Sequence, residues 1–189
     1  MIGYILPMRL VFISFFFLVL FSCQSDLDVD RDGVVDDIDH EHNTREGVPV
    51  DENGVMQNPI YLDENGITIK AKDWAFVGDS GMLNGEEYLI VSRQQLRYKI
   101  VNGEDVTHVC TSRLVYLSGM IREMPSFNQN ISHWDTANVI DMESMFSGAI
   151  SFNQDLRHWD VKKVVRCNSF SANTPEWVLP KPIFSNCSP

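Results

Sequence analysis

Five aspartates and one glycine near the N-terminus follow one another at the spacing of a cation-binding loop. The aspartates occupy positions 1, 3, 5, 9 and 12 of that loop: Asp28, Asp30, Asp32, Asp36 and Asp39. Gly33 stands at position 6, where the chain must turn sharply, and Val34 at position 7 can add its backbone carbonyl. Six or more converging oxygens suit Ca²⁺. We therefore predict that this loop binds calcium, the alternative being a solvated acidic linker.

The loop resembles a thrombospondin type 3 repeat, and residues 43–54 continue that pattern. A single copy is present, and the cysteine usual after the loop is missing. His40 and His42 flank the loop but lack a second pair of ligands, so we do not expect a transition-metal site there.

A second set of residues that could do chemistry is a pair of His-Trp-Asp segments. His133 and Asp135 recur 25 residues later as His158 and Asp160, and a histidine near a carboxylate can serve acid–base catalysis. Because the two copies belong to a longer repeat, we interpret them as structural. The sequence contains no glycine-rich phosphate loop, nucleophile elbow or zinc motif. We predict that the protein is not an enzyme.

That longer repeat has a period of 25 residues. Residues 114–138 and 139–163 align without a gap and share eight identical positions, including Ser-Phe-Asn-Gln and His-Trp-Asp. A third copy starts with Val164 and is expected to break off after Phe170. A unit of this length cannot bury its apolar face alone, so neighbouring copies must stack into a solenoid.

The repeat also predicts its own core. The aromatic pairs Phe127/Phe152 and Trp134/Trp159 should stack between neighbouring coils, while the Asn and Gln beside them should satisfy turn backbone groups. In the second copy, Asp141 is expected to cap a short helix that ends near Gly148.

The segment before the repeats predicts strands and one helix. Asn-Gly steps at 53–54, 65–66 and 84–85 favour tight turns, the last within a hairpin that ends near Val91. Ser92 and Gln95 form a capping box that opens a helix, which should stop at 102–103. We expect these elements to cover the open end of the first repeat.

The N-terminus predicts export and lipidation. Arg9 precedes an apolar run from Leu10 to Phe21, which is too short to span a bilayer as a helix and is typical of a secretory signal. Residues 20–23 resemble a bacterial lipobox, which implies acylation of Cys23, the alternative being an ordinary signal peptide with a chance cysteine. Residues 25–26 and the acids after them resemble surface-export signals, which implies the outer face of the outer membrane.

Charge argues against nucleic acid as a partner. The chain has a net charge of −11, and residues 24–54 hold 11 of its 26 acidic residues. Nucleic-acid phosphates require clustered Lys and Arg, which this chain does not offer.

Two cysteines near the C-terminus should form a disulfide. Cys167 lies where the third copy weakens and Cys187 lies two residues from the end of the chain, in a protein whose thiols should meet an oxidising compartment. Closing this loop stabilises the chain by roughly 3 kcal/mol. Cys110 then remains as the unpaired thiol.

The repeat phrases at 142–146, 152–156 and 158–161 are similar to those of the BspA-like leucine-rich repeat surface proteins, also called the DUF285 family. Segments from 68 to 112 and from 179 to 187 resemble the blocks that flank these repeats in the family. The resemblance implies surface display and adhesin-like binding. Its first copy departs from the pattern at 117–119 and 123–125.

Together these patterns predict an α/β fold class: a short leucine-rich-like repeat solenoid with a 25-residue period, a small α+β N-terminal cap and a disulfide-closed C-terminal cap. The expected divisions are a signal peptide at 1–22, a lipidated calcium-binding stalk at 23–55, the α+β cap at 56–112, the repeats at 113–170 and the C-terminal cap at 171–189.

We expect a non-enzymatic, lipid-anchored surface module that binds an extracellular protein or glycan. The outward side chains of the second copy are its candidate contacts: Glu143, Ser147, Arg157, Lys162 and Lys163. The alternative is a structural envelope spacer or an assembly partner of another membrane protein.

Overall fold

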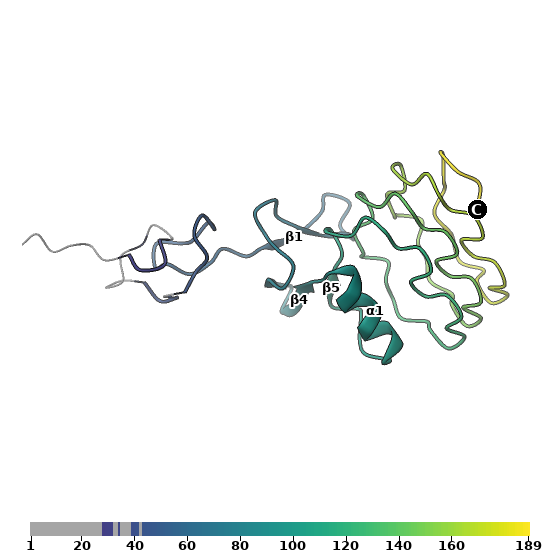
Figure 1. Cartoon of the computed structure of the whole chain (residues 1–189), viewed down its shortest axis with the longest axis horizontal. Helices are drawn as coiled ribbons and strands as arrows, with labels where there is room; N and C mark the ends of the chain where they lie inside the picture. The colour runs from purple at the N-terminus through teal and green to yellow at the C-terminus, as the bar shows by residue number, and fades with distance from the viewer. Residues whose placement is uncertain (1–27, 32–33, 35–38, 42) are drawn as a thin grey trace, which may run out of the picture.

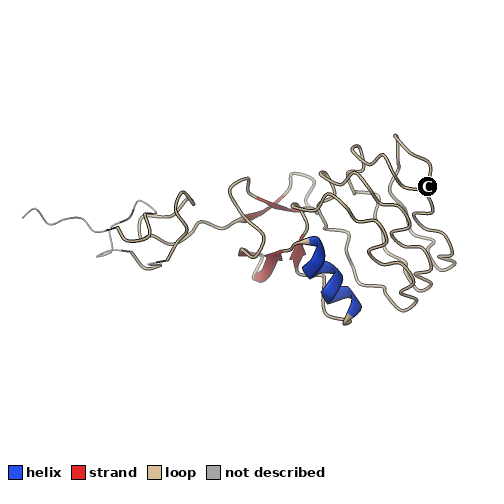
Figure 2. Ribbon diagram, viewed as in Figure 1, coloured by secondary structure: helices blue, strands red, loops and turns tan. Residues whose placement is uncertain are grey.

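The computed structural model describes residues 28–31, 34, 39–41 and 43–189 (Figure 1). The predicted signal peptide, the lipidation site Cys23 and two of the predicted calcium ligands, Asp32 and Asp36, lie outside these residues. Most of the described chain is coil and turn, with a few short strands and one helix (Figure 2).

Two small sheets precede the repeats. Strands β1 (Ile60–Leu62) and β2 (Ile69–Ala71) pair antiparallel, and strands β3 (Ser80–Leu83) and β4 (Glu86–Ile90) form a hairpin. The short strand β5 (Val109–Cys110) pairs parallel to β4. The Asn-Gly step of the β3–β4 turn has φ values of 54° at Asn84 and 87° at Gly85, which confirms the predicted tight hairpin.

Helix α1 (Arg93–Val101) forms the crossover between the parallel strands β4 and β5 of the second sheet. The capping box is confirmed, because the Ser92 hydroxyl accepts from the Gln95 amide and the Gln95 side chain accepts from the Ser92 amide. The helix ends at Asn102, as predicted, and it buries Leu96 and Ile100 against the repeat core.

The repeats follow as neighbouring loops of chain that lie side by side (Figure 1). We call residues 114–138, 139–163 and 164–188 the first, second and third repeat. Single parallel bridges join equivalent positions, Tyr116 to Asp141 and Asp141 to Arg166. Four alternate amides of one repeat donate to four alternate carbonyls of the next: amides of 117, 119, 121 and 123 to carbonyls of 141, 143, 145 and 147, and amides of 142, 144, 146 and 148 to carbonyls of 166, 168, 170 and 172. We call this arrangement the repeat ladder.

The ladder explains why the predicted short helix after Asp141 is wrong. Residues 143–148 form consecutive turns instead. Every second amide there leaves the segment for the next repeat, so no continuous run of helical hydrogen bonds can form. Ser144, with φ of 52°, also lies in the left-handed region. The Asp141 side chain still accepts a hydrogen bond from the amide of Glu143, but it caps a turn.

Aromatic side chains form columns across the repeats, as predicted. The Phe127 and Phe152 rings stack at 6.0 Å with an interplanar angle of 18°, and the Trp134 and Trp159 rings at 6.3 Å with 8°. The indole nitrogen of Trp159 donates to the carbonyl of Ile131. The amide prediction is also confirmed, because the Gln154 side chain donates to the Asn128 carbonyl.

The third repeat extends further than its sequence predicts. It does not break off after Phe170: Trp177 occupies the position of Phe152, and its indole nitrogen donates to the carbonyl of Gln154. Phe184 occupies the position of Trp159 and packs on Phe170 with ring centroids 5.0 Å apart. Different aromatic residues thus keep the column, which an identity search misses.

The predicted disulfide is confirmed. Cys167 and Cys187 are joined with their Cα atoms 5.9 Å apart, and the bond ties the last residues of the chain to the third repeat. Cys110 is the free cysteine of the described chain and is buried. Within the described residues, no helix has the length and apolar character needed to cross a membrane.

Candidate functional site

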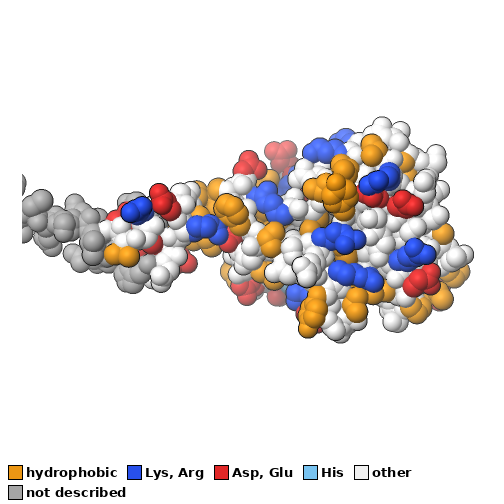
Figure 3. Space-filling view, viewed as in Figure 1, with side chains coloured by type: hydrophobic (Ala, Val, Ile, Leu, Met, Phe, Trp, Pro, Cys, Tyr) orange, Lys and Arg blue, Asp and Glu red, His pale blue; other side chains and the backbone are white. Residues whose placement is uncertain are grey.

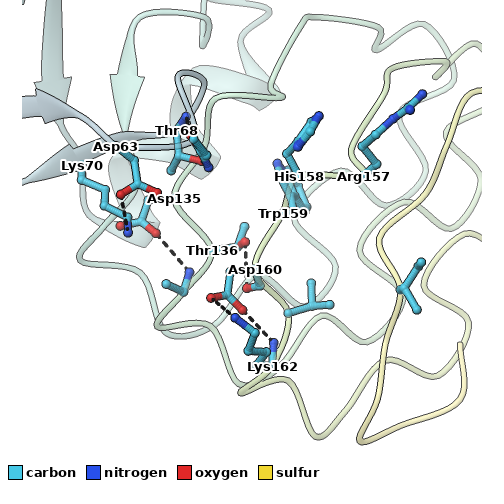
Figure 4. Close-up of a pocket in the computed structure, with 14 residues that line it drawn as sticks. Asp63, Thr68, Lys70, Asp135, Thr136, Arg157, His158, Trp159, Asp160 and Lys162 are labelled. Carbon is cyan, nitrogen blue, oxygen red and sulfur yellow. Dashed lines mark hydrogen bonds and ion pairs between the residues drawn. The ribbon is translucent and has the colours of Figure 1, made fainter.

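A polar cavity of about 360 Å³ lies where the β1–β2 hairpin meets the repeats (Figure 4). Its walls come from three parts of the chain: the hairpin, the first and second repeats, and one residue of the third. The hairpin supplies Asp63, Asn65, Thr68 and Lys70; the repeats supply residues 135–137, 157–162 and Ile183. A volume of this size suits a small ligand or one or two units of a larger one.

The hairpin wall is set by local turn chemistry. The amide of Gly66 donates to the carbonyl of Asp63, and the Asn65 side chain bonds Thr68, which closes the loop between β1 and β2. Lys70 on β2 reaches Asp63 with 3.2 Å between its ammonium nitrogen and a carboxylate oxygen. Burial alone would lower the pKa of Lys70, but Asp63 and Asp135 outweigh it and raise that pKa. Lys70 therefore stays charged at the cavity wall.

The first repeat is tied to the hairpin through its backbone. The amide of Ile69 donates to the carbonyl of His133 at 2.9 Å. Asp135 is buried, and its carboxylate accepts from the Ser112 hydroxyl at 2.6 Å and from the amide of Ala137 at 3.1 Å. These contacts fix the wall between hairpin and repeats, so the cavity is held in shape before any ligand arrives.

The second repeat supplies the exposed charges. Arg157 pairs with Asp155 at 2.8 Å, and Lys162 pairs more loosely with Asp160 at 3.4 Å. The hydrogen bond from Arg157 lowers the pKa of Asp155, and the same contact raises the pKa of Arg157. Trp159 lines the cavity but is only 4% exposed, and its indole nitrogen is already bonded. The ring is therefore core and offers no open stacking face.

The cavity combines carboxylates, ammonium and guanidinium groups, hydroxyls and one imidazole on a fixed frame. Such a lining can both donate to and accept from a ligand with many polar groups, such as a glycan or a charged peptide segment. Each carboxylate already holds a structural partner, and neither His133 nor His158 hydrogen-bonds the aspartate of its own His-Trp-Asp segment in the described chain.

The predicted contact residues separate into different places. Arg157 and Lys162 both line the cavity. Lys163 is exposed nearby in sequence but donates to the Asn138 side chain at 2.8 Å. Glu143 instead lines a shallower depression with Ser118, Gly119 and Arg122, and Ser147 is half-buried with its carbonyl used in the ladder. The structure therefore brings two of the five predicted residues together at this cavity.

The two histidines of the repeat differ in their surroundings. His133 is largely buried beneath the hairpin, and burial lowers its pKa to about 4. Its ring lies 6.0 Å from that of Tyr88, and its second ring nitrogen has no hydrogen-bond partner in the described chain. His158, at the same repeat position, is exposed and lines the cavity. One sequence motif therefore serves the core in one copy and the surface in the next.

For the predicted calcium loop, the described residues give part of the ligand set. Asp39 is buried, and its carboxylate accepts from the amide of Glu41 at 2.8 Å. Across the described residues, no three His, Cys, Asp or Glu side chains gather as a metal site would require. Since Asp32 and Asp36 are outside this part of the chain, calcium binding remains a prediction.

Sequence reasoning missed the hairpin half of the cavity. The turn at 63–66 is recognisable from its Asn-Gly step, but nothing in the spacing shows that it lines one cavity with the second repeat. Asp63, Thr68 and Lys70 reach the site only through tertiary contacts.

The comparisons with known proteins bear on the repeat region. Residues 92–180 match the family described as "Mycoplasma protein of unknown function, DUF285". The matched stretch runs from the N-cap Ser92 of α1 through the first two repeats and into the third, past Trp177. No curated protein and no solved structure shows a significant match to the chain.

Proposed function

We propose that this protein is a non-enzymatic surface module that binds an extracellular glycan or protein, and that the cavity between the hairpin and the second repeat is its principal contact site. The observation that carries the proposal is the lining of that cavity, in which Arg157, His158 and Lys162 stand exposed on a wall fixed by Asp135 and Lys70. The cavity is open at the surface, so it suits a chain end or a side branch of a larger ligand.

A glycan fits this lining best. Sugar hydroxyls both donate and accept, and the cavity offers carboxylate acceptors beside ammonium and guanidinium donors. The alternating pairs Asp155–Arg157 and Asp160–Lys162 keep the surface nearly balanced in charge. Such a surface favours hydroxyl-rich ligands over strongly charged ones.

The rest of the chain has a supporting role in this proposal. The repeats and their stacked aromatic columns form a short solenoid, with the sheets and α1 as its N-terminal cap. Acylated Cys23 anchors the chain to the outer membrane, and calcium stiffens the acidic stalk at 23–55. Arg45, within that stalk, contacts the cap, because it pairs with Asp79 at 3.0 Å and its guanidinium lies 4.1 Å from the centre of the Phe76 ring.

A glycan array probed with the full chain in detergent micelles tests the binding proposal. The double variant Arg157→Glu, Lys162→Glu should lose at least about 1 kcal/mol of binding free energy to the glycans that the wild type selects. The matched control Arg122→Glu changes an exposed charge away from the cavity and should leave binding unchanged. Equal binding by all three proteins would overturn the proposal.

The stalk and the anchor have their own tests. Calorimetric titration with Ca²⁺ should give heat for the wild type and none for the double variant Asp30→Ala, Asp32→Ala, while equal heats would remove calcium from the proposal.

Radiolabelled fatty acid should enter the wild type and not Cys23→Ala. Incorporation into both would remove the anchor.

One observation favours the structural alternative, an envelope spacer or assembly partner. Val115 and Val165 are 38% and 59% exposed and lie in one column with half-buried Ile140, joined by amide-to-carbonyl bonds. An apolar column of this kind suits contact with another protein. Under this alternative, the double variant Ile140→Asp, Val165→Asp should no longer associate with envelope complexes. The wild-type protein should bind no glycan on the array.

A further inference from the structure

The repeat ladder has a direction, and its two ends differ. Within the ladder, each repeat accepts at carbonyls that face the previous repeat and donates from amides that face the next. Outside the ladder, the amides of Ile140 and Val165 donate in the opposite direction, to the carbonyls of Val115 and Ile140. The first repeat therefore presents unused carbonyls toward the N-terminal elements, and the third presents amides away from the body of the ladder. Where such groups are buried they need a protein partner, and where they are exposed they bind water or are available to a ligand.

At the N-terminal end, helix α1 supplies those partners. Arg93 donates to the carbonyls of Tyr116 and Ser118 at 3.2 and 3.0 Å, and Arg97 donates to the carbonyl of Met120 at 2.6 Å. These carbonyls stand at the positions that accept amides in the second and third repeats. The two guanidinium groups thus replace the amides of a preceding repeat.

At the C-terminal end, no element does the same. The amides equivalent to the ladder donors belong to Cys167, Ser169, Ser171 and Asn173, and they donate no hydrogen bond to any residue of the described chain. Cys167 is covered by the disulfide segment, but Ser169 and Asn173 are exposed and Ser171 is half-buried. We call these three residues the open donor row.

A cation reinforces this row. The ammonium group of Lys181 lies 3.1 Å from the Ser171 hydroxyl and 4.9 Å from the centre of the Trp177 ring. The row therefore presents backbone donors beside a positive charge. It is complementary to a ligand that offers hydrogen-bond acceptors and negative charge.

A second copy of this chain does not fit. Head-to-tail stacking requires free carbonyls on the first repeat, and Arg93 and Arg97 occupy three of the four, those of Tyr116, Ser118 and Met120. Tail-to-tail contact would set donors against donors and Lys181 against Lys181. The occupant must be a different molecule.

We propose that the open donor row docks an acidic polypeptide segment of a partner protein. The ladder itself supports a polypeptide, because amides of this spacing meet carbonyls of alternate residues one to one in two successive repeats. Lys181 selects an acidic side chain in that segment. This site is separate from the cavity proposed above, so either can fail without the other.

The probe is a heptapeptide of alternating Val and Glu with blocked ends, titrated against the full chain in detergent micelles. Amide hydrogen exchange followed by NMR should show Ser169, Ser171 and Asn173 protected roughly tenfold by saturating peptide. Gly119 and Ser144, the equivalent amides already bonded in the ladder, should not change. The same peptide with Lys in place of Glu should not bind.

Lys181→Glu should weaken the heptapeptide about threefold, and Lys72→Glu, an exposed charge reversal away from the row, should not. Failure of the heptapeptide to bind at millimolar concentration overturns the proposal. So does binding that protects other amides, or protection of these three amides by dextran sulfate and not by the peptide.

Discussion

The two ends of the repeat ladder meet the same physical problem in different ways. At the first repeat, two arginines of α1 donate to carbonyls that would otherwise face no partner. At the third repeat, a disulfide and the Phe170–Phe184 contact cover the apolar edge, while the backbone donors of Ser169, Ser171 and Asn173 stay open. One end is closed by hydrogen bonds, and the other by covalent and apolar contacts.

This difference teaches what a short repeat array needs. The aromatic columns continue with different aromatic residues in the third repeat, as Trp177 and Phe184 show, but the backbone ladder can be ended only by groups of matching polarity. Arg93 and Arg97 close the side where the carbonyls emerge. Basic side chains are also spread over the visible face of the repeats (Figure 3). The amide side is where the molecule retains unmet binding capacity.

The largest effect is expected from opening the disulfide end. Cys187→Ser removes a cross-link that spans a sequence separation of 20 residues, and it should lower the free energy of unfolding by roughly 3 kcal/mol. Urea denaturation of oxidised protein measures this loss. Reducing agent should destabilise the wild type to the same level and leave Cys187→Ser unchanged. A loss below about 1 kcal/mol would mean that the aromatic contacts alone close this end.

At the arginine end, Arg97→Met keeps the aliphatic stem but removes the donor to Met120, whose side chain is fully buried. We expect a loss of about 2 kcal/mol, because a carbonyl is left unsatisfied. Arg93→Met, at a more exposed site, should cost about 1 kcal/mol. Arg157→Met removes a surface guanidinium whose one hydrogen-bond partner among the described residues is Asp155, and it should leave stability unchanged. Equal stability of Arg97→Met and wild type would remove the capping role.

The smallest expected effect is the pH dependence of the free energy of unfolding, to which His133 should contribute and His158 should not. Burial holds the pKa of His133 at about 4, below the ordinary 6.5, so the unfolded chain binds a proton at higher pH than the folded one. Stability is then complete above pH 6.5 and falls on acidification, by about 1 kcal/mol between pH 6.5 and 5.5. Urea titrations at several pH values should show this slope reduced in His133→Gln and retained in His158→Gln. A slope that survives His133→Gln would place its origin elsewhere.

Much of the repeat region is predictable from sequence, because identical residues at a fixed interval imply identical environments. Phe127, Phe152, Trp134 and Trp159 stack as expected for this reason, and the Cys167–Cys187 bond follows from position and compartment. The helix expected after Asp141 fails because helical periodicity cannot reveal that alternate amides bond to the next repeat. The sequence repeat does not reveal that the third repeat continues through Trp177 and Phe184, because these positions keep an aromatic side chain but not the same residue.

The candidate cavity is only half predictable. Arg157 and Lys162 follow from the outward positions of the second repeat, whereas Asp63 and Lys70 come from a hairpin about 90 residues earlier, which no local pattern places beside them. The burial of His133 and the exposure of His158 have the same origin. The hairpin covers the first repeat through the Ile69–His133 hydrogen bond and leaves the second open.

Residue-resolved amide hydrogen exchange of the unliganded chain tests the central claim most directly. Ser144 and Ser169 are the same residue type at the same repeat position, with φ of 52° and 56°. In the part of the chain that the structure describes, only the amide of Ser144 has an acceptor, the carbonyl of Asn168 at 2.9 Å. The account predicts that Ser169 exchanges roughly a hundredfold faster than Ser144. Equal exchange rates at the two positions would contradict an open donor row and a ladder that ends at the third repeat.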